Sequence, residues 1–478
     1  MFVRGALISL VLLLVTPMSA SAAGPGGWSN VGGGLNDTVS ALNADQPGVL
    51  YVGGRFTDAG GNAAADRIAM WNGTAWGNLG PADSLPGAAS SVNAIAVFGG
   101  RVYAGGTFGD GAGPKPDFLA VWDGVAWQPT CATLSAGVLS LEVVGGTLFV
   151  GGNFLDVSGD PAADQLIRCD AATGAYLGPT VDMDSDLDGG IQALAGDSAG
   201  NLYAGGTFIN LDAVAQADYV AKFNGGWSAL GSGSGPGLGA IDTANVDSLA
   251  ADGTTVYVGT DADDIAGDPA IDYVGRWNGS SWSSLGSGFF PAPTAVNGIA
   301  VGGGEVFVTG SFQNGGGNAQ ADNVARFSGT GWSNVGSNGA GNGPFLGTGN
   351  AVAIFGSSLI VGGGFVDAGG DSGADRIASF PLSGSGGGGS APPDVEIGKS
   401  PKRKIVTTKP KAKVTFTFDA AGASGFECRL DKAAFADCSS PKKYRVKPGR
   451  HTFSVQALDA TGAPGAVDTS RFKVKRKR

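Results

Sequence analysis

Histidine is almost missing from this sequence of 478 residues. His451 is the single histidine, and the chain has only four cysteines, four methionines and, among its 41 acidic residues, four glutamates. A Ser-His-Asp triad, a multi-histidine zinc or copper site and histidine-based acid–base catalysis are therefore excluded from residues 1–450. Paired aspartates can still cleave glycosidic bonds. The composition thus leaves an Asp-based, polysaccharide-acting enzyme, a glycoside hydrolase or lyase, as the catalytic alternative.

The N-terminus has the pattern of a secretory signal peptide. Arg4 precedes an apolar run over residues 6–15, and small residues at 19–23 offer a cleavage site after Ala22 or Ala23. This run is much shorter than the roughly 20 residues of a membrane-spanning helix, which disfavours the alternative of a membrane anchor. We therefore predict that residues 1–23 are a signal peptide, that the mature protein is secreted, and that no segment spans a membrane.

Glycine, by contrast, is abundant, with 86 residues against a usual share of about 7%. Much of it belongs to a segment of about 50 residues that recurs seven times. Each copy has an apolar alternating stretch, a strand that ends in glycine, a third strand before a tight turn, and a fourth strand led in six copies by Trp or Tyr. The glycine strands cover residues 51–56, 103–108, 149–154, 203–208, 257–260, 307–312 and 360–365. This patterning predicts four short strands per repeat and an all-β fold.

Four antiparallel strands repeated seven times predict a seven-bladed β-propeller over residues 24–382. The last repeat ends at Phe380 without a Trp-led fourth strand, whereas an orphan strand of this type stands at the N-terminus, over Trp28–Val31. We expect this N-terminal strand to pair with Ile377–Phe380, complete the last blade and join the two ends of the ring.

The glycine-pair strands and the Trp-Asn-Gly or Trp-Asp-Gly ends of the third strands, as at Trp71 and Trp122, resemble the repeats of secreted bacterial kelch and galactose-oxidase-like propellers. The resemblance implies the fold but not the function, because propellers carry many unrelated activities. Galactose oxidase holds copper with histidines and a modified tyrosine, and no residue here can be matched to that site. We therefore expect no cofactor, with calcium as the one exception considered below.

One acidic position recurs in every repeat, five residues before the aromatic residue or cysteine that ends the third strand. Its members are Asp66, Asp117, Asp164, Asp218, Asp272, Asp322 and Asp375. An Asp just before a strand can accept hydrogen bonds from backbone N–H groups of the preceding loop and fix its shape. We favour this structural role, because catalytic residues are seldom copied into every repeat. A sevenfold carboxylate ring that binds cations is the alternative.

A second recurrent position, one residue before the end of the third strand, is basic in four consecutive repeats. Its basic members are Arg168, Lys222, Arg276 and Arg326. If their charged ends emerge on one face, they form an arc that could take an acidic sugar or another anion. The alternative is that their stems cover apolar surface while the charged ends reach water or nearby aspartates.

The densest group of carboxylates resembles the first half of a calcium loop. Asp184, Asp186 and Asp188 stand at alternate positions before Gly189, as in an EF-hand. Position 12 is Ala195 instead of glutamate, so a calcium ion would need ligands from another loop. The alternative is a solvated acidic connection between blades.

After Leu382 the composition changes, which predicts a Gly/Ser/Pro linker over residues 383–393 and a second domain over 394–478. Strand-like alternation predicts a small β-sandwich. The run from Phe426 to Cys438 and the segments 447–453 and 456–459 resemble bacterial immunoglobulin-like domains. In that setting we expect Cys428 and Cys438 to bridge neighbouring strands. Cys131 and Cys169 are candidates for a second disulfide in the propeller, although four cysteines allow other pairings.

Charge separates the two predicted domains. Residues 391–478 carry 20 Lys and Arg against 8 Asp and Glu, a net charge of +12, whereas residues 1–390 carry −23. The basic domain and its tail could hold the protein on an anionic cell envelope or polysaccharide; nucleic acid is not an expected partner of a secreted protein. We therefore predict a secreted, monomeric, non-catalytic binding or adhesion protein, in which the propeller presents loops to an extracellular glycan or protein ligand.

Overall fold

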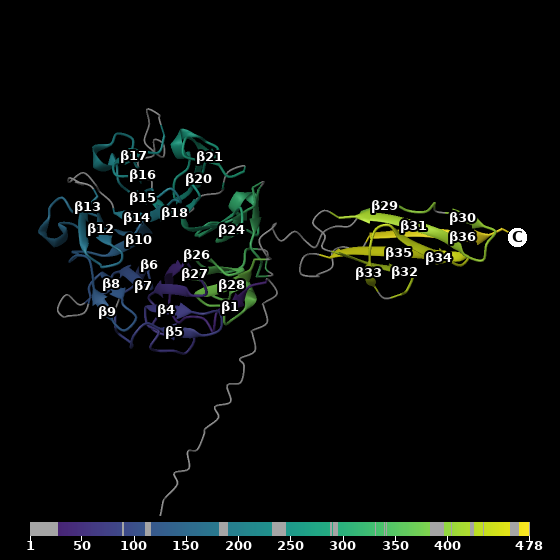
Figure 1. Ribbon diagram of the computed structural model, residues 1–478, viewed down its shortest axis with the longest axis horizontal. Helices are drawn as coiled ribbons and strands as arrows, with labels where there is room; N and C mark the ends of the chain where they lie inside the picture. Colours follow the sequence, from purple (N-terminus) through teal and green to yellow (C-terminus); the bar gives the residue numbers. More distant parts are fainter. Residues whose placement is uncertain are drawn as a thin grey trace, which may run out of the picture. The chain divides into compact units, whose positions relative to one another are not determined.

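The computed structural model (Figure 1) describes residues 27–87, 90–109, 116–180, 190–231, 245–286, 289, 295–329, 331–338, 340, 342–382, 396–402, 404–420, 425–433, 435–458 and 468–477. The chain divides into two compact units, Met1–Pro381 and Leu382–Arg478. The predicted signal peptide, residues 1–23, and the predicted linker, residues 383–393, lie outside the described residues. No helix in the described segments is long and apolar enough to cross a membrane.

Within its described residues, the first unit consists of seven antiparallel sheets of four strands each. The first strands are β2 (Val39–Asn43), β6 (Val92–Phe98), β10 (Val138–Val144), β14 (Ile191–Gly196), β18 (Val246–Asp252), β22 (Val296–Gly302) and β26 (Gly349–Phe355). The second strands are β3 (Leu50–Gly54), β7 (Arg101–Gly106), β11 (Thr147–Gly152), β15 (Leu202–Gly206), β19 (Thr255–Thr260), β23 (Glu305–Gly310) and β27 (Ser358–Gly363). The predicted all-β fold with repeated four-stranded sheets is thus confirmed.

The outer half of each sheet follows the same order. The third strands are β4 (Ile68–Trp71), β8 (Leu119–Trp122), β12 (Leu166–Asp170), β16 (Val220–Phe223), β20 (Val274–Trp277), β24 (Val324–Phe327) and β28 (Ile377–Pro381). The fourth strands are β5 (Trp76–Asn78), β9 (Trp127–Pro129), β13 (Tyr176–Pro179), β17 (Trp227–Ala229), β21 (Trp282–Ser284), β25 (Trp332–Asn334) and β1 (Ser29–Asn30). Figure 1 shows the first strands near the middle of the unit and the fourth strands at its rim.

The N-terminal strand β1 belongs to the last sheet. It pairs antiparallel with β28, with Ser29 opposite Ser379 and Asn30 opposite Ala378. Trp28 just before it is fully buried. Its indole Nε1 donates to the carbonyl oxygen of Val335, 2.8 Å away. Trp127, Trp282 and Trp332 make the equivalent bond to the residue after the preceding sheet's fourth strand, so Trp28 takes the place of the missing tryptophan of the last repeat.

The glycine pairs of the second strands allow neighbouring sheets to pack closely. A Cβ atom added at Gly53 would lie 2.7 Å from Val92 Cγ1 of the next sheet, and one at Gly259 would lie 2.7 Å from Val296 Cγ1. Contacts this short are not tolerated, so a larger residue would push the two sheets apart. Part of the glycine excess is therefore a packing requirement.

Successive sheets contact each other through their first strands, from β2 to β6 and onward to β26, and β26 in turn contacts β2. Hydrophobic clusters fill the spaces between sheets; one of them joins Val39 and Val52 of the first sheet to Ile360 and Ile377 of the last. Short 3-10 turns follow the second strands of the last five sheets. They are η1 (Val157–Gly159), η2 (Leu211–Ala213), η3 (Ile265–Gly267), η4 (Gly315–Gly317) and η5 (Ala368–Gly370).

The second unit has two sheets that share one core. The three-stranded sheet has the order β29-β31-β34 and the five-stranded sheet the order β30-β36-β35-β32-β33. Phe416 of the first sheet stacks on Phe453 of the second, with ring centroids 4.0 Å apart. The strands are β29 (Glu396–Lys399), β30 (Lys404–Thr407), β31 (Ala412–Asp419), β32 (Gly425–Leu430), β33 (Ala436–Cys438), β34 (Lys442–Val446), β35 (Gly449–Leu458) and β36 (Asp468–Arg476).

Candidate functional site

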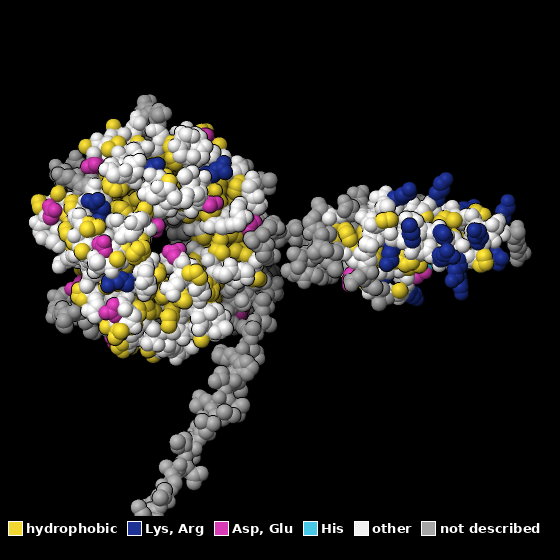
Figure 2. All heavy atoms as spheres, viewed as in Figure 1, with side chains coloured by type: hydrophobic (Ala, Val, Ile, Leu, Met, Phe, Trp, Pro, Cys, Tyr) yellow, Lys and Arg dark blue, Asp and Glu magenta, His cyan; other side chains and the backbone are white. Residues whose placement is uncertain are grey.

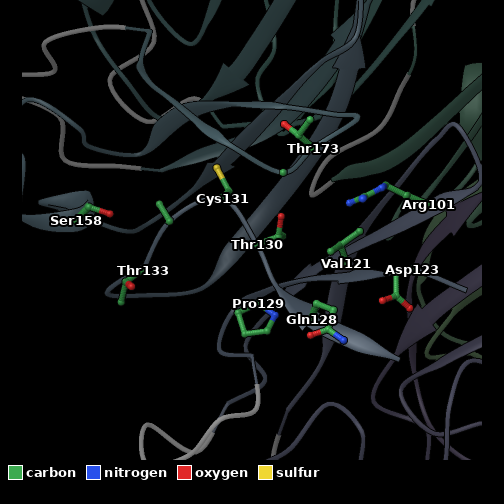
Figure 3. Close-up of a pocket in the computed structure, with 12 residues that line it drawn as sticks. Arg101, Val121, Asp123, Gln128, Pro129, Thr130, Cys131, Thr133, Ser158 and Thr173 are labelled. Carbon is green, nitrogen blue, oxygen red and sulfur yellow. The ribbon is translucent and has the colours of Figure 1, made fainter. Parts of the chain in front are cut away.

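A pocket of about 550 Å³ lies between the second and third sheets of the first unit. Strands β7, β8 and β9 contribute one wall, and the segment between β9 and β10, the turn after β12 and η1 contribute the rest (Figure 3). Its lining is rich in hydroxyl and other polar side chains and contains no aromatic residue. The lining residues are Arg101, Val121, Asp123, Gln128, Pro129, Thr130, Cys131, Ala132, Thr133, Ser158, Thr173 and Gly174.

A disulfide bond fixes the wall of this pocket. Cys131, which lies after β9, is bonded to Cys169 on β12, so the segment that connects the two sheets is tied to the third sheet. The Cys131 N–H also donates to the carbonyl oxygen of Gly174, 2.9 Å away. The second disulfide, Cys428–Cys438, joins β32 and β33 in the other unit. Both cysteine pairs are those that the sequence suggests.

Arg101 supplies the pocket's positive charge. Its guanidinium group points into the pocket between Thr173 and Val121 (Figure 3), and the side chain lies beside the hydroxyl of Tyr103. Burial raises the pKa of Tyr103, and the nearby Arg101 opposes that rise. Among the ion pairs found in the described residues, none involves Arg101. The guanidinium thus contacts the Tyr103 hydroxyl and, in the described part of the chain, is paired with no carboxylate.

Asp123 supplies a negative charge on the same side of the pocket as Arg101, because it directly follows Trp122, which stands opposite Val102 in the register of β7 and β8 (Figure 3). Its Oδ1 accepts hydrogen bonds from the N–H groups of Ala126 and Val125, at 2.8 and 2.9 Å. These bonds hold the pKa of Asp123 below its usual value, so the carboxylate is charged at neutral pH. With Arg101, Gln128 and several hydroxyls, it makes the pocket suited to a ligand that carries both a negative charge and hydroxyl groups.

The pattern that the repeats share does not identify this pocket, but the third repeat departs from that pattern at residues near the pocket. The third repeat is the one in which the turn between the third and fourth strands lengthens to Asp170–Gly174, where Asp170 accepts the N–H groups of Ala172 and Thr173. It is also the repeat that contains Cys169. Both departures from the pattern lie at the pocket wall.

Two carboxyl groups on the central strands have strongly raised pKa values. Figure 2 shows acidic side chains beside a hollow at the centre of the first unit. Burial, together with the charge of Asp45, raises the pKa of Glu142 on β10 to about 8. Burial and the charge of Asp261 raise that of Asp247 on β18 to about 7. Glu142 stands where the register places alanine in five other sheets, so a comparison of the repeats could have found it.

Five of the recurrent aspartates, among the described residues, accept the same backbone hydrogen bond. In each, Oδ1 accepts the backbone N–H of the residue eight positions earlier, at 2.6 to 3.2 Å. The five are Asp164, Asp218, Asp272, Asp322 and Asp375. Asp66 differs, because its Oδ2 accepts the Arg67 guanidinium and the N–H of Asp83. Asp117 follows residues 110–115, which lie outside the described part of the chain.

The four basic residues of the third strands are each engaged within their own sheet. Lys222 Nζ lies 5.8 Å from the centroid of the Tyr203 ring. Arg276 donates to Ser283 Oγ at 3.2 Å, and Arg168 donates to the carbonyl oxygen of Pro179 at 3.1 Å. Arg326 Nη1 lies 3.7 Å from Glu305 Oε1. This geometry favours side chains that cover their own sheets over an anion-binding arc.

The candidate calcium ligands Asp184, Asp186 and Asp188 lie outside the described residues, so the calcium site stays a prediction. Within the described residues, no group of three or more His, Cys, Asp or Glu side chains is placed to hold a metal ion.

Comparisons with known proteins give little further information. No protein-family model matches the chain, and no curated protein matches it. Among solved structures, a similarity exists to the fibronectin(III)-like modules of Clostridium thermocellum CbhA, with 24% identity over 18% of this chain and 100% of that chain. The TM-score is 0.15, too low to carry an argument about fold or function.

Proposed function

We propose that this chain is a secreted, non-catalytic binding or adhesion protein. Its first unit is a seven-bladed β-propeller that presents ligand-binding loops, and its second unit is an immunoglobulin-like domain that attaches the protein to an anionic polymer of a cell envelope. The contact of β26 with β2 and the pairing of β1 with β28 support a closed propeller. Two disulfides support an extracellular location, because such bonds persist in oxidising compartments.

The observation that carries the attachment role is a row of like charges across three adjacent strands of the second unit. Lys473 on β36 pairs directly with Arg450 on β35 and with Lys404 on β30. Like charges opposite each other destabilise a sheet. Among the described residues, no Lys or Arg of this unit takes part in an ion pair. An anionic polymer laid across the row would neutralise charges that the fold leaves uncompensated.

The other sheet of this unit repeats the arrangement. Lys413 on β31 stands opposite Arg445 on β34, and both side chains are exposed. Lys and Arg side chains are spread widely over the second unit in Figure 2, with few acidic ones among them. A surface of this kind attracts extended polyanions by long-range electrostatics that salt weakens.

A chromatographic comparison tests the attachment. The full chain and a chain that lacks residues 391–478 are applied at low salt to immobilised heparin, a model polyanion, and to neutral dextran. We expect the full chain to bind heparin and elute with salt, and the shortened chain to pass through both columns. Equal retention of the two chains on heparin would contradict the proposal.

The catalytic alternative also has an observation in its favour. A carboxyl group with a pKa of about 8, as at Glu142, can serve as a general acid near neutral pH. Incubation of the protein with a panel of acidic and neutral polysaccharides, followed by product analysis, separates the two functions. Binding without new reducing ends or unsaturated products is the expected result, and turnover that Glu142→Gln abolishes would establish the enzyme instead.

A further inference from the structure

We propose that the pocket between the second and third sheets binds a carboxylated sugar, such as a uronic acid residue of an acidic glycan. This inference deepens the proposed function. It depends on that function in one respect, namely that the protein binds its ligand without converting it. The ligand's carboxylate would contact Arg101. Its hydroxyl groups would face Asp123, Gln128 and the hydroxyls of Thr130 and Thr133.

Arg101 is the residue of the lining that would bind an anionic group of the ligand. The unit around it is strongly acidic, with a net charge of −23 over residues 1–390, yet the described residues place no carboxylate in an ion pair with this guanidinium. The fork of N–H donors in arginine matches a carboxylate bidentately. A half-buried arginine that points into a pocket and contacts a tyrosine hydroxyl, with no carboxylate paired to it among the described residues, is therefore suited to a carboxylate ligand.

The rest of the lining selects for hydroxyl groups. Thr130, Thr133 and Ser158 present hydroxyls that can donate and accept hydrogen bonds. Asp123 uses Oδ1 for its own turn, and the Gln128 side chain also hydrogen-bonds its carboxylate, so the two side chains together offer an acceptor and a donor to a hydroxyl group of the ligand. The carboxylate of Asp123 also repels a second anionic group at that side. A singly charged ligand rich in hydroxyls therefore suits this lining.

The size and rigidity of the pocket agree with a small saccharide. Its volume of about 550 Å³ falls in the range of about 300–1,000 Å³ that is usual for small-molecule sites. The Cys131–Cys169 disulfide and the bond from the Cys131 N–H to Gly174 hold one wall in place. A wall fixed before binding reduces the entropy lost when the ligand is ordered.

Isothermal titration calorimetry with the full chain tests the site. The probes are galacturonic acid and its neutral counterpart galactose, at millimolar concentration and low ionic strength. We expect galacturonic acid to bind and galactose to bind about tenfold or more weakly, because a charge-assisted hydrogen bond is lost. Arg101→Gln should weaken galacturonic acid by about the same factor, and Arg101→Lys, which keeps the charge, should retain part of the affinity.

Arg55→Gln is the matched control, since Arg55 is an exposed arginine of the same unit outside the pocket lining. It removes the same charge and should leave the affinity unchanged. Thermal unfolding of each variant verifies that it is folded. The proposal is overturned if galacturonic acid does not bind, if galactose binds as well, or if Arg55→Gln and Arg101→Gln have equal effects. Heparin retention measured on the same variants tests the attachment role separately, and turnover of a galacturonoside would contradict only the non-catalytic function.

Discussion

The amide nitrogen Nδ2 of Asn350, on the first strand of the last sheet, donates a hydrogen bond to the carbonyl oxygen of Val39 on the first strand of the first sheet, 2.9 Å away. The same bond joins the sixth and seventh sheets, from Asn297 to Gly349 at 3.1 Å. Residues 311 positions apart in sequence are thus joined in the way that consecutive sheets are joined.

Removal of this hydrogen bond should therefore lower the stability of the unit by about as much as removal of the same bond between two consecutive sheets. Asn350→Ala leaves the Val39 carbonyl without its partner, and we expect a loss of about 1 kcal/mol in the free energy of unfolding. Asn297→Ala is the matched control and should cost a similar amount. Chemical denaturation followed by tryptophan fluorescence measures both. A neutral Asn350→Ala beside a destabilising Asn297→Ala would contradict closure between the first and last sheets.

The recurrent aspartates lead to a second prediction, best made at Asp322. Its Oδ1 accepts the Asn314 N–H at 2.6 Å, at the start of a loop that contains η4. Asp322→Ala should destabilise the unit by about 1 kcal/mol or more and increase proteolysis in residues 313–321. Asp322→Asn keeps an acceptor oxygen and should cost little. If both variants behave alike, the side chain does not hold the loop.

Glu142 makes the stability of the first unit depend on pH. Its pKa is raised from 4.5 to about 8, and Gly196 donates its N–H to Oε1 at 3.1 Å. A raised pKa in the folded state means that stability is greatest below pH 4.5 and falls as pH rises toward 8. Glu142→Gln keeps an acceptor without the charge, so it should be more stable than wild type by on the order of 2 kcal/mol at neutral pH.

The comparison of Glu142→Gln with wild type is made by urea unfolding at a series of pH values. The two curves should meet at acid pH and separate as pH rises. Asp45→Asn removes one cause of the raised pKa of Glu142. In this background the difference in stability between the Glu142→Gln variant and the protein that keeps Glu142 should therefore be smaller. A constant difference across the whole range would show that the carboxyl group titrates normally.

His451 makes the stability of the second unit depend on pH, in a different pH range. Its Nδ1 lies 2.9 Å from Asp431 Oδ2 and its Nε2 lies 2.8 Å from the Lys447 carbonyl oxygen. Both partners are acceptors, so both ring nitrogens donate only when the ring is protonated. Partial burial lowers the pKa of His451, but these hydrogen bonds outweigh it and raise the pKa above 6.5.

The stabilisation from His451 is therefore complete below pH 6.5 and is lost as pH rises through the raised pKa. Hydrogen exchange of the β35 amides should become faster as pH rises above 6.5 once the intrinsic pH dependence is subtracted. His451→Asn should abolish this change, and Asp431→Asn should shift it to lower pH. An unchanged profile in His451→Asn would assign the effect to another group.

Much of the fold follows from the sequence because its signals repeat. Period-two patterning marks the strands in every copy, and the Trp that leads a fourth strand also marks the N-terminal strand that completes the last sheet, where Ser29 pairs with Ser379. Because the pattern occurs seven times, a strand that is assigned wrongly in one copy can be recognised by comparison with the other copies. The cysteine pairs were expected because each lies in one predicted domain.

The candidate site was much less predictable. Arg101 and Asp123 are single residues in one repeat, and nothing in the sequence places them together in the lining of one pocket. The basic residues Arg276 and Arg326 share a register position that suggested an anion site, but their partners Ser283 and Ser333 stand opposite them in their own sheets. Side-chain partners across strands depend on the pairing register, which composition and spacing do not determine.

The central claim, attachment through the like-charged row of the second unit, is tested most directly by salt elution of full-length variants from heparin. The triple variant Lys404→Gln, Arg450→Gln, Lys473→Gln removes the row, and the triple variant Lys409→Gln, Lys432→Gln, Lys447→Gln removes equal charge from exposed positions outside the strands. The account predicts that the first variant elutes at clearly lower salt than wild type and that the second elutes close to it. Equal shifts in the two variants, or none in either, would contradict it.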